Sequence, residues 1–160
     1  LAECYFYGKG VPEKDETRAL ELLREAAAAG DIRALNRLGD NYVRGIPGKL
    51  DHDPDEAFRL FTRASERGSL DALGNLGVLY MNGTGVPAKD PRKGAALFEK
   101  GAQGNNPFCM FLYANCLEKG LGVGKNMLLA TNLYRKAAEA GYRPAVDWCR
   151  KNAVTFTPKN

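Results

Sequence analysis

Residues 73–86 read LGNLGVLYMNGTGV. The first half of this stretch places apolar and small residues at offsets of 0, 3, 4 and 7: Leu73, Leu76, Gly77 and Tyr80. Residues with these offsets lie on one face of an α-helix. The second half, NGTGV, is rich in glycine and is typical of a loop. The stretch therefore predicts a helix that is followed by a glycine loop.

The same pattern occurs four times along the 160 residues. A loop glycine recurs at intervals of 37, 38 and 37 positions: Gly8, Gly45, Gly83 and Gly120. Three further columns follow the same frame: Asp15, Asp53, Asp90 and Asn126; Ala19, Ala57, Gly94 and Ala130; Gly30, Gly68, Asn105 and Gly141. A second apolar series with helical offsets follows each loop, for example Ala57, Leu60, Phe61 and Ala64. Each repeat is therefore predicted to contain a helix A, a loop and a helix B.

Capping chemistry predicts where helix B begins and ends. Asp53-Pro54 and Asp90-Pro91 each pair an N-cap acceptor with a proline suited to the first helical position. Asp53 with Glu56 further suggests a capping box. Left-handed residues are expected just after the alanine-rich helix ends, at Gly30, Gly68, Asn105 and Gly141.

Gly39 and Gly77 stand inside predicted helices, where glycine costs about 1 kcal/mol relative to alanine. Their positions suggest the close approach of a neighbouring helix, with Tyr42 and Tyr80 filling the adjoining space. One helix pair cannot bury its own apolar face, so it has to stack on its neighbours. The sequence therefore predicts an all-α fold, an α-α superhelix or solenoid of antiparallel helix pairs with a period of 36–38 residues.

These columns resemble the Sel-1-like repeat (SLR) family, a tetratricopeptide-like group of helical repeats. In that family L-G-x-x-Y-x-x-G-x-G-V, D-x-x-x-A and K-A-A-x-x-G recur within one unit. The best matches are residues 76–90 and the stretch RKAAEAG at 135–141, and the resemblance covers nearly the whole chain. The sequence departs from the pattern at residues 45–48, where the loop is longer, and at Leu117, which replaces the tyrosine. Both departures are expected to change the loops and not the fold.

One solenoid of about four repeats is predicted over residues 1–152, followed by a tail over 153–160. The first residues already fall in helix-A columns: Leu1, Ala2 and Tyr5. The first repeat is therefore expected to be truncated, with upstream repeats in a longer parent chain. Arg150 occupies the column of Gly39 and Gly77, where its side chain would block another helix. Residues 144–152 are accordingly predicted to form a terminal capping helix.

Composition and charge narrow the classes of function. The chain is 44% hydrophobic and 26% charged with a net charge of +4, which is typical of a globular domain. Residues 120–160 hold seven Lys and Arg against two Asp and Glu, whereas the first 119 residues are close to neutral. A helical-repeat RNA binder would need a basic face and base-reading residues in each repeat, so no nucleic-acid partner is predicted. No apolar run reaches the roughly 18 residues of a membrane span.

No catalytic residue, metal or cofactor is predicted. The single histidine, His52 between Asp51 and Asp53, lacks the three or four converging ligands of a metal site and is interpreted as a solvated loop residue. The glycines at 83–85 and 120–122 lack the preceding strand and the Lys-Ser/Thr pair of a phosphate-binding loop. Their recurrence in the repeat frame favours a role in loop geometry.

The four cysteines, Cys4, Cys109, Cys116 and Cys149, form neither a C-x-x-C motif nor a zinc-binding spacing. Cys109 and Cys116 stand in one predicted helix about 10 Å apart along its axis, too far for a disulfide. Cys109 and Cys149 fall in packing columns and are interpreted as core residues. Unpaired cysteines favour a cytoplasmic location, and periplasmic or secreted locations stay open.

The tetratricopeptide-like resemblance implies that the A helices line a concave face, where positions outside the packing columns meet a ligand. The candidate partner-binding residues are Phe6, Tyr7, Arg33, Asn36, Asp40, Arg44, Val78, Met81, Asn82, Phe111, Asn115 and Lys119. Several of them are more apolar than a solvated face requires, which favours an interaction surface. Internal packing of these apolar residues is the alternative. A carboxylate clamp of the tetratricopeptide type is not predicted, because Asp40 and Val78 stand where its asparagine is needed.

The predicted function is a non-catalytic scaffold or adaptor that binds a protein or peptide on the concave A-helix face. Cysteine-rich members of the family imply an alternative, the binding or hydrolysis of β-lactams or other cell-wall ligands. Those members carry a paired cysteine in each repeat, and this sequence lacks that pairing. It also shows no nucleophile with a matching base, which a hydrolase would need.

Overall fold

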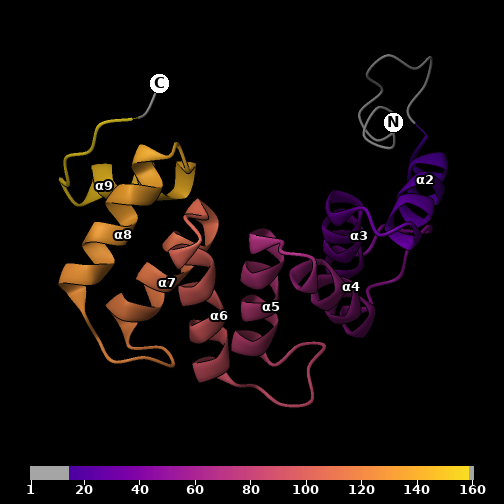
Figure 1. Ribbon diagram of the computed structural model, residues 1–160, viewed down its shortest axis with the longest axis horizontal. Coiled ribbons are helices and arrows are strands. Elements are labelled where there is room, and N and C mark those ends of the chain that lie inside the picture. The colour runs from indigo at the N-terminus through magenta and orange to yellow at the C-terminus, as the bar shows by residue number, and fades with distance from the viewer. Residues whose placement is uncertain (1–14, 159–160) are drawn as a thin grey trace. The chain divides into compact units, whose positions relative to one another are not determined.

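The computed structural model describes residues 15–158 (Figure 1). This part of the chain contains α-helices and no β-strand. In chain order the helices are α2 (Glu16–Ala28), α3 (Ile32–Arg44), α4 (Pro54–Glu66), α5 (Leu70–Asn82), α6 (Pro91–Gln103), α7 (Pro107–Lys119), α8 (Met127–Glu139) and α9 (Arg143–Lys151). The predicted all-α architecture is confirmed. The expected first helix A, with Cys4, Phe6 and Tyr7, lies outside the described residues.

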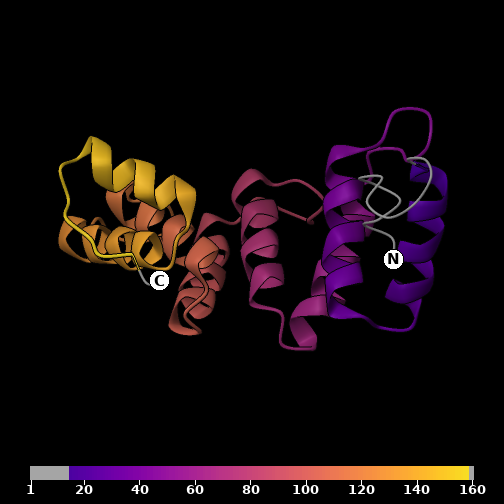
Figure 2. The same cartoon turned by 90° about the horizontal axis from the view of Figure 1, so that it is seen from above.

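The chain divides into two compact units at the end of a repeat. The first unit, Leu1–Ser69, contains α2, α3 and α4, and the second, Leu70–Asn160, contains α5 to α9. Within each unit every helix packs against the next one along the chain, and α5 also contacts α7. Within the second unit, α5 and α6 lie side by side in both views (Figures 1 and 2). No helix between residues 15 and 158 is long and apolar enough to cross a bilayer.

Side-chain caps begin the B helices as the sequence predicts. Each of four residues accepts a hydrogen bond of 3.0 Å from the backbone N–H three residues further on: Asp15, Asp53, Asp90 and Asn126. The suggested capping box at Asp53 is wrong. The Glu56 carboxylate instead accepts a hydrogen bond from Arg59 at 3.0 Å, and the Asp53 N–H donates to the carbonyl of Tyr42 at 2.9 Å.

Left-handed residues end the B helices. The backbone angle φ is +86° at Gly30, +91° at Gly68, +62° at Asn105 and +81° at Gly141. At the end of α2, the Gly30 N–H donates to the carbonyl of Ala27 and the Asp31 N–H donates to the carbonyl of Ala26, both at 3.0 Å. This pair of bonds defines a Schellman motif. The predicted helix ends are therefore confirmed, including the one asparagine.

One backbone hydrogen bond closes each loop from helix A to helix B. The N-cap residue of helix B donates over 2.9 Å to a carbonyl near the end of helix A: Asp53 to Tyr42, Asp90 to Tyr80 and Asn126 to Leu117. Because both groups belong to the main chain, the change from tyrosine to Leu117 leaves the bond intact. The loop at 45–53 keeps the same closure although it contains an isolated bridge between Ile46 and Leu50. The two departures from the repeat pattern thus leave the helix pairing unchanged.

Glycines inside the A helices let an aromatic ring from helix B approach the helix backbone. A Cβ atom on Gly39 would lie 2.6 Å from Cε1 of Phe61, and a Cβ atom on Gly77 would meet the ring of Phe98. Both phenylalanines are buried. The predicted role of these glycines as contact points is confirmed.

The last helix, α9, buries Ala145 and Cys149 and exposes Arg150. After α9, Val154 and Phe156 are partly buried against the core of the second unit. The segment expected to form a tail therefore folds back onto the helices through these two side chains.

Candidate partner-binding surface on the A helices

A core residue occupies the same position in three A helices: Leu35 in α3, Leu73 in α5 and Met110 in α7. Five positions relative to it, −2, +1, +5, +8 and +9, lie outside the recurrent packing columns. We name these positions the A-helix face. In order they hold Arg33, Asp71 and Phe108; Asn36, Gly74 and Phe111; Asp40, Val78 and Asn115; Val43, Met81 and Glu118; Arg44, Asn82 and Lys119. The residue types in the packing columns recur, whereas those on the A-helix face change in charge and size between repeats.

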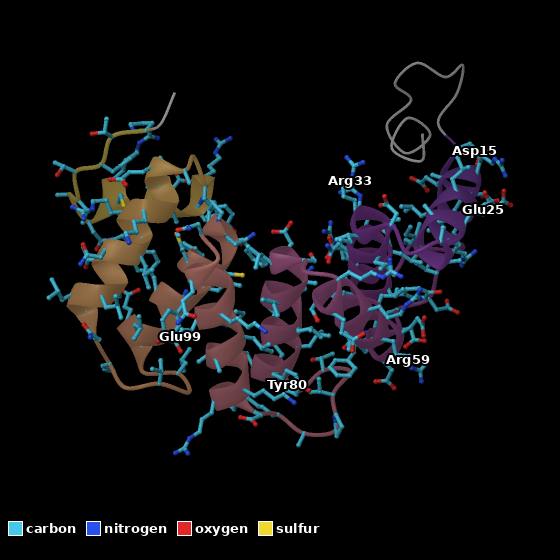
Figure 3. All side chains as sticks on the ribbon, in the orientation of Figure 1. Asp15, Glu25, Arg33, Arg59, Tyr80 and Glu99 are labelled. Atoms are coloured by element: carbon cyan, nitrogen blue, oxygen red, sulfur yellow. The ribbon has the colours of Figure 1, made fainter. Side chains whose placement is uncertain are left out.

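In the first unit the A-helix face is largely polar. Arg33 and Arg44 are exposed, and Arg33 projects from the beginning of α3 (Figure 3). Asn36 is half-buried, and its Nδ2 donates a hydrogen bond to Oγ of Ser69 at 2.7 Å. Asp40 is also half-buried. The two arginines therefore remain accessible, while the Asn36 amide is already engaged within the unit.

In the second unit the apolar candidates take part in internal packing. Val78, Met81 and Phe111 are partly buried against the core cluster. The ring of Phe111 lies 5.4 Å from that of Tyr134 and 5.5 Å from that of Tyr142, measured between ring centroids. These three side chains therefore contribute to the core and present only part of their surface to solvent.

The polar candidates of the second unit are more accessible. Asn82 at the end of α5 and Lys119 at the end of α7 are exposed, and Asn115 is half-buried. A partner that lies along α5 and α7 would meet these polar groups together with the uncovered edges of the apolar side chains.

An open cavity of about 320 Å³ lies at the beginnings of α5, α7 and α9. Its lining includes Asp71, Asn106, Phe108 and Tyr142. The Asn106 side chain orients the carboxylate of Asp71 through a hydrogen bond of 2.7 Å from Nδ2 to Oδ1. The rings of Phe108 and Tyr142 are 6.2 Å apart and tilted by 54°. The cavity thus offers two aromatic walls and one oriented carboxylate.

Sequence reasoning missed these four cavity residues. Asp71 and Phe108 share the register of Arg33, which was a candidate, so the repeat frame already contained a signal for them. Asn106 and Tyr142 occupy the N-cap positions of α7 and α9. A cap position alone gives no sign that the helix of the preceding repeat brings a carboxylate beside it.

The described cysteines are buried and free. Burial raises the pKa of the Cys109 thiol to about 12, with the nearby Asp71 carboxylate adding to the shift, and burial raises the pKa of Cys116 to about 11. Thiols with these pKa values stay protonated at neutral pH and are poor nucleophiles. Burial also raises the pKa of Cys149. Cys109 and Cys149 are core residues, as the sequence predicts.

His52 is exposed and has a local contact in its loop. Its Nδ1 lies 2.7 Å from the carbonyl oxygen of Val43, which can only accept, so Nδ1 carries the hydrogen and donates it. Between residues 15 and 158, no group of three or more His, Cys, Asp and Glu side chains is arranged to hold a metal ion.

Comparison with known proteins places this geometry in a family. The model of the Sel1 repeat family matches residues 1–31, 32–69, 70–106 and 107–142. Each of the last three segments contains one A helix and one B helix. The chain is 30% identical over 148 residues to DAP3-binding cell death enhancer 1 of Rattus norvegicus. That match covers 92% of this chain but only 28% of the length of the rat protein.

Two solved structures share the helical-repeat fold. A Sel1 repeat protein from Oxalobacter formigenes superposes with a TM-score of 0.85 at 28% identity, over 91% of this chain and 56% of its own. Cysteine rich protein B of Helicobacter pylori superposes with a TM-score of 0.63 at 25% identity, over 87% of this chain and 98% of its own. The free cysteines described above lack the pairing expected of cysteine-rich relatives, so the β-lactam alternative has no support. With four matched repeats and an α-α solenoid fold, the chain belongs to the Sel1 repeat family.

Proposed function

We propose that this chain is a non-catalytic module that holds a segment of a partner protein on its A-helix face. Sel1 repeat proteins generally mediate interactions between proteins, and the name of the similar rat protein says that it binds DAP3. One observation carries the proposal: the positions on the A-helix face vary in charge and size between repeats, while the packing columns keep small or large apolar residues. Such a surface can be specific for a partner without disturbing the fold that supports it.

The second unit provides the contacts that we expect a partner to use. The cavity beside Phe108 and Tyr142 is large enough for a side chain, and the Asp71 carboxylate favours a basic or hydrogen-bond-donating group there. Asn82 and Lys119 are exposed further along α5 and α7. A segment that lies on these two helices would therefore contact an aromatic cavity near one end and polar groups near the other.

Crosslinking mass spectrometry of the full-length protein in its native host tests this proposal. Lys119 lies on the A-helix face, whereas Lys100 in α6 and Lys136 in α8 lie on B helices, and all three are exposed. An amine-reactive reagent should join a partner of the A-helix face to Lys119. Partners joined only to Lys100 and Lys136 would contradict the proposal.

A pair of matched variants then tests the contact directly. Lys119→Glu should reduce recovery of that partner by affinity capture, carried out without the crosslinking reagent, about tenfold, because the charge at an interface contact is reversed. Lys100→Glu makes the same change of charge on a B helix and should leave recovery unchanged. Circular dichroism should show the same helical content in both variants, since both side chains are exposed.

A further inference from the structure

Large apolar side chains are exposed together at the beginning of α8. Met127 is 52% exposed, Leu128 78% and Leu129 39%, and Leu121 in the preceding loop is 44% exposed. The corresponding first turns of α2, α4 and α6 read ETR, PDE and PRK, so the repeat frame does not require apolar residues at these positions. A group of exposed apolar side chains on an otherwise polar helix surface is typical of an interaction site.

A pocket of about 300 Å³ opens beside this turn, between α6, α7 and α8. Its lining mixes apolar and polar residues: Met110, Tyr113, Leu129 and Leu133 stand beside Glu99, Gln103, Asn105 and Lys136. A pocket of this size that combines apolar and polar lining groups suits one large side chain from a partner. Leu129 belongs both to the exposed turn and to the pocket, so the two form one continuous surface. We name this surface the α8 patch.

The surroundings of the α8 patch are basic. Exposed cationic side chains stand on α6, on α8 and on the loop that joins α7 to α8: Arg92, Lys100, Lys125 and Lys136. The backbone of Gly122 in this loop lies against Pro91, which brings the loop to the beginning of α6.

Three acidic side chains on or beside the same elements make local contacts. Glu99, labelled in Figure 3, accepts a hydrogen bond from the Tyr113 hydroxyl at 3.0 Å. Glu139 lies 3.9 Å from Arg135, and Asp90 caps α6. Glu99 keeps its negative charge, but the cations of α6, α8 and the loop between α7 and α8 outnumber the carboxylates, so the net charge around the α8 patch is positive: Arg92, Lys93, Lys100, Lys125, Arg135 and Lys136 against Asp90, Glu99 and Glu139.

We propose that the α8 patch binds an acidic amphipathic segment of a partner protein. One large apolar side chain of that segment enters the pocket beside Leu129, others cover Leu128 and Met127, and its carboxylates face Lys125 and Lys136. A second copy of this chain would bring like charges together, and a flat lipid surface would leave the pocket unfilled. The α8 patch lies on the B-helix side of the repeats, so this proposal stands independently of the A-helix face.

Selection from a displayed library of random peptides, each about 16 residues long, tests the proposal with a defined probe. The purified chain should enrich a class of peptides with net negative charge and at least two large apolar residues. Fluorescence anisotropy of the synthesised peptides should show about tenfold weaker binding to Leu128→Asp and to Lys136→Glu. Leu129→Asp, which places a charge in the pocket wall, should weaken binding at least as much.

Matched control variants show whether the selected peptides bind the α8 patch rather than another surface. Val43 in α3 is 37% exposed, which is close to the 39% of Leu129. Val43→Asp should therefore leave these peptides bound as tightly as before. Lys119→Glu should also have no effect on them, so failure of the A-helix face and failure of the α8 patch are distinguishable. Melting temperatures show whether each variant is folded, and Leu128 is exposed enough for its variant to fold normally.

Three results would overturn the proposal. The first is the absence of an acidic, apolar class of peptides whose binding depends on Leu128. The second is flotation of the chain with phosphatidylserine vesicles that is lost in Leu128→Asp, which would assign the patch to a lipid surface. The third is self-association in sedimentation equilibrium that is lost in the same variant, which would assign it to a second copy.

Discussion

Phe98 in α6 lies with its ring against the α-carbon of Gly77 in α5, where a side chain would otherwise begin. A Cβ atom on Gly77 would lie 2.6 Å from Cδ1 of Phe98 and 3.0 Å from the carbonyl oxygen of Gly94. The relationship is reciprocal, because a Cβ atom on Gly94 would lie 2.9 Å from the carbonyl oxygen of Gly77. The two helices therefore cross at a pair of glycines, with an aromatic ring packed beside the crossing.

Replacing Gly77 by alanine should destabilise the fold. The added methyl group has no space, and overpacking of this kind costs about 1–3 kcal/mol, more than the gain of about 1 kcal/mol in helix propensity. Urea denaturation should show a lower free energy of unfolding for Gly77→Ala. Gly124→Ala is the control, because no atom lies within 4 Å of its Cβ position. An unchanged stability of Gly77→Ala would mean that the crossing accommodates a methyl group.

Gly141 allows a test of backbone strain without a steric clash. It ends α8 with φ of +81°, and no atom lies within 4 Å of a Cβ built there. Gly141→Ala should cost about 1–2 kcal/mol, the penalty of a left-handed conformation. Gly141→Asn should cost less, since Asn105 adopts φ of +62° at the same position of the preceding repeat. Equal losses for the two variants, measured by urea denaturation, would rule out this explanation.

The sequence predicts most strongly the features that depend on one residue's own conformation. Asn126 caps a helix and Gly141 ends one because each property belongs to the residue and its nearest neighbours along the chain. The capping box at Asp53 fails for a related reason, since the Glu56 side chain can reach Arg59 as well as the N-cap. The ends of the B helices are predictable because glycine or asparagine recurs at the same position of each repeat, so several copies support the same helix end.

The candidate site is less predictable, because its properties depend on neighbouring repeats. Phe111 occupies a helix position that looks open in the sequence, yet Tyr142 from the beginning of α9 packs against it. Met81 similarly lies against Gly94 of α6. The cavity beside Asp71 forms because the beginnings of α7 and α9, which follow in later repeats, lie next to the beginning of α5. The pattern within one helix shows which positions lie outside its packing columns. It does not show which of these positions a neighbouring helix covers.

Stability should fall at alkaline pH because of the buried thiols. The pKa of Cys116 rises from 9.0 to about 11 on burial, and the pKa of Cys109 rises to about 12. Above about pH 9 the unfolded chain releases protons that the folded chain retains, so stability is complete below this pH and decreases as the pH rises toward 11. The urea midpoint should therefore be lower at about pH 10 than at about pH 8. The double variant Cys109→Ala, Cys116→Ala should show a smaller difference between the two pH values, whatever its stability at pH 8, and an unchanged difference would exclude the thiols as the cause.

Phe111→Asp should destabilise the second unit rather than merely remove a binding contact. Its ring lies between Tyr134 and Tyr142, so the substitution removes aromatic packing and places a carboxylate among rings, at a cost of about 2–4 kcal/mol. Lys119→Glu changes an exposed side chain and should shift the free energy of unfolding by about 0.5 kcal/mol or less. Loss of a partner in Phe111→Asp would therefore not locate the binding surface, whereas loss in Lys119→Glu would. Urea denaturation of both variants decides between packing and binding, because a Phe111→Asp chain as stable as Lys119→Glu would make Phe111 an accessible anchor.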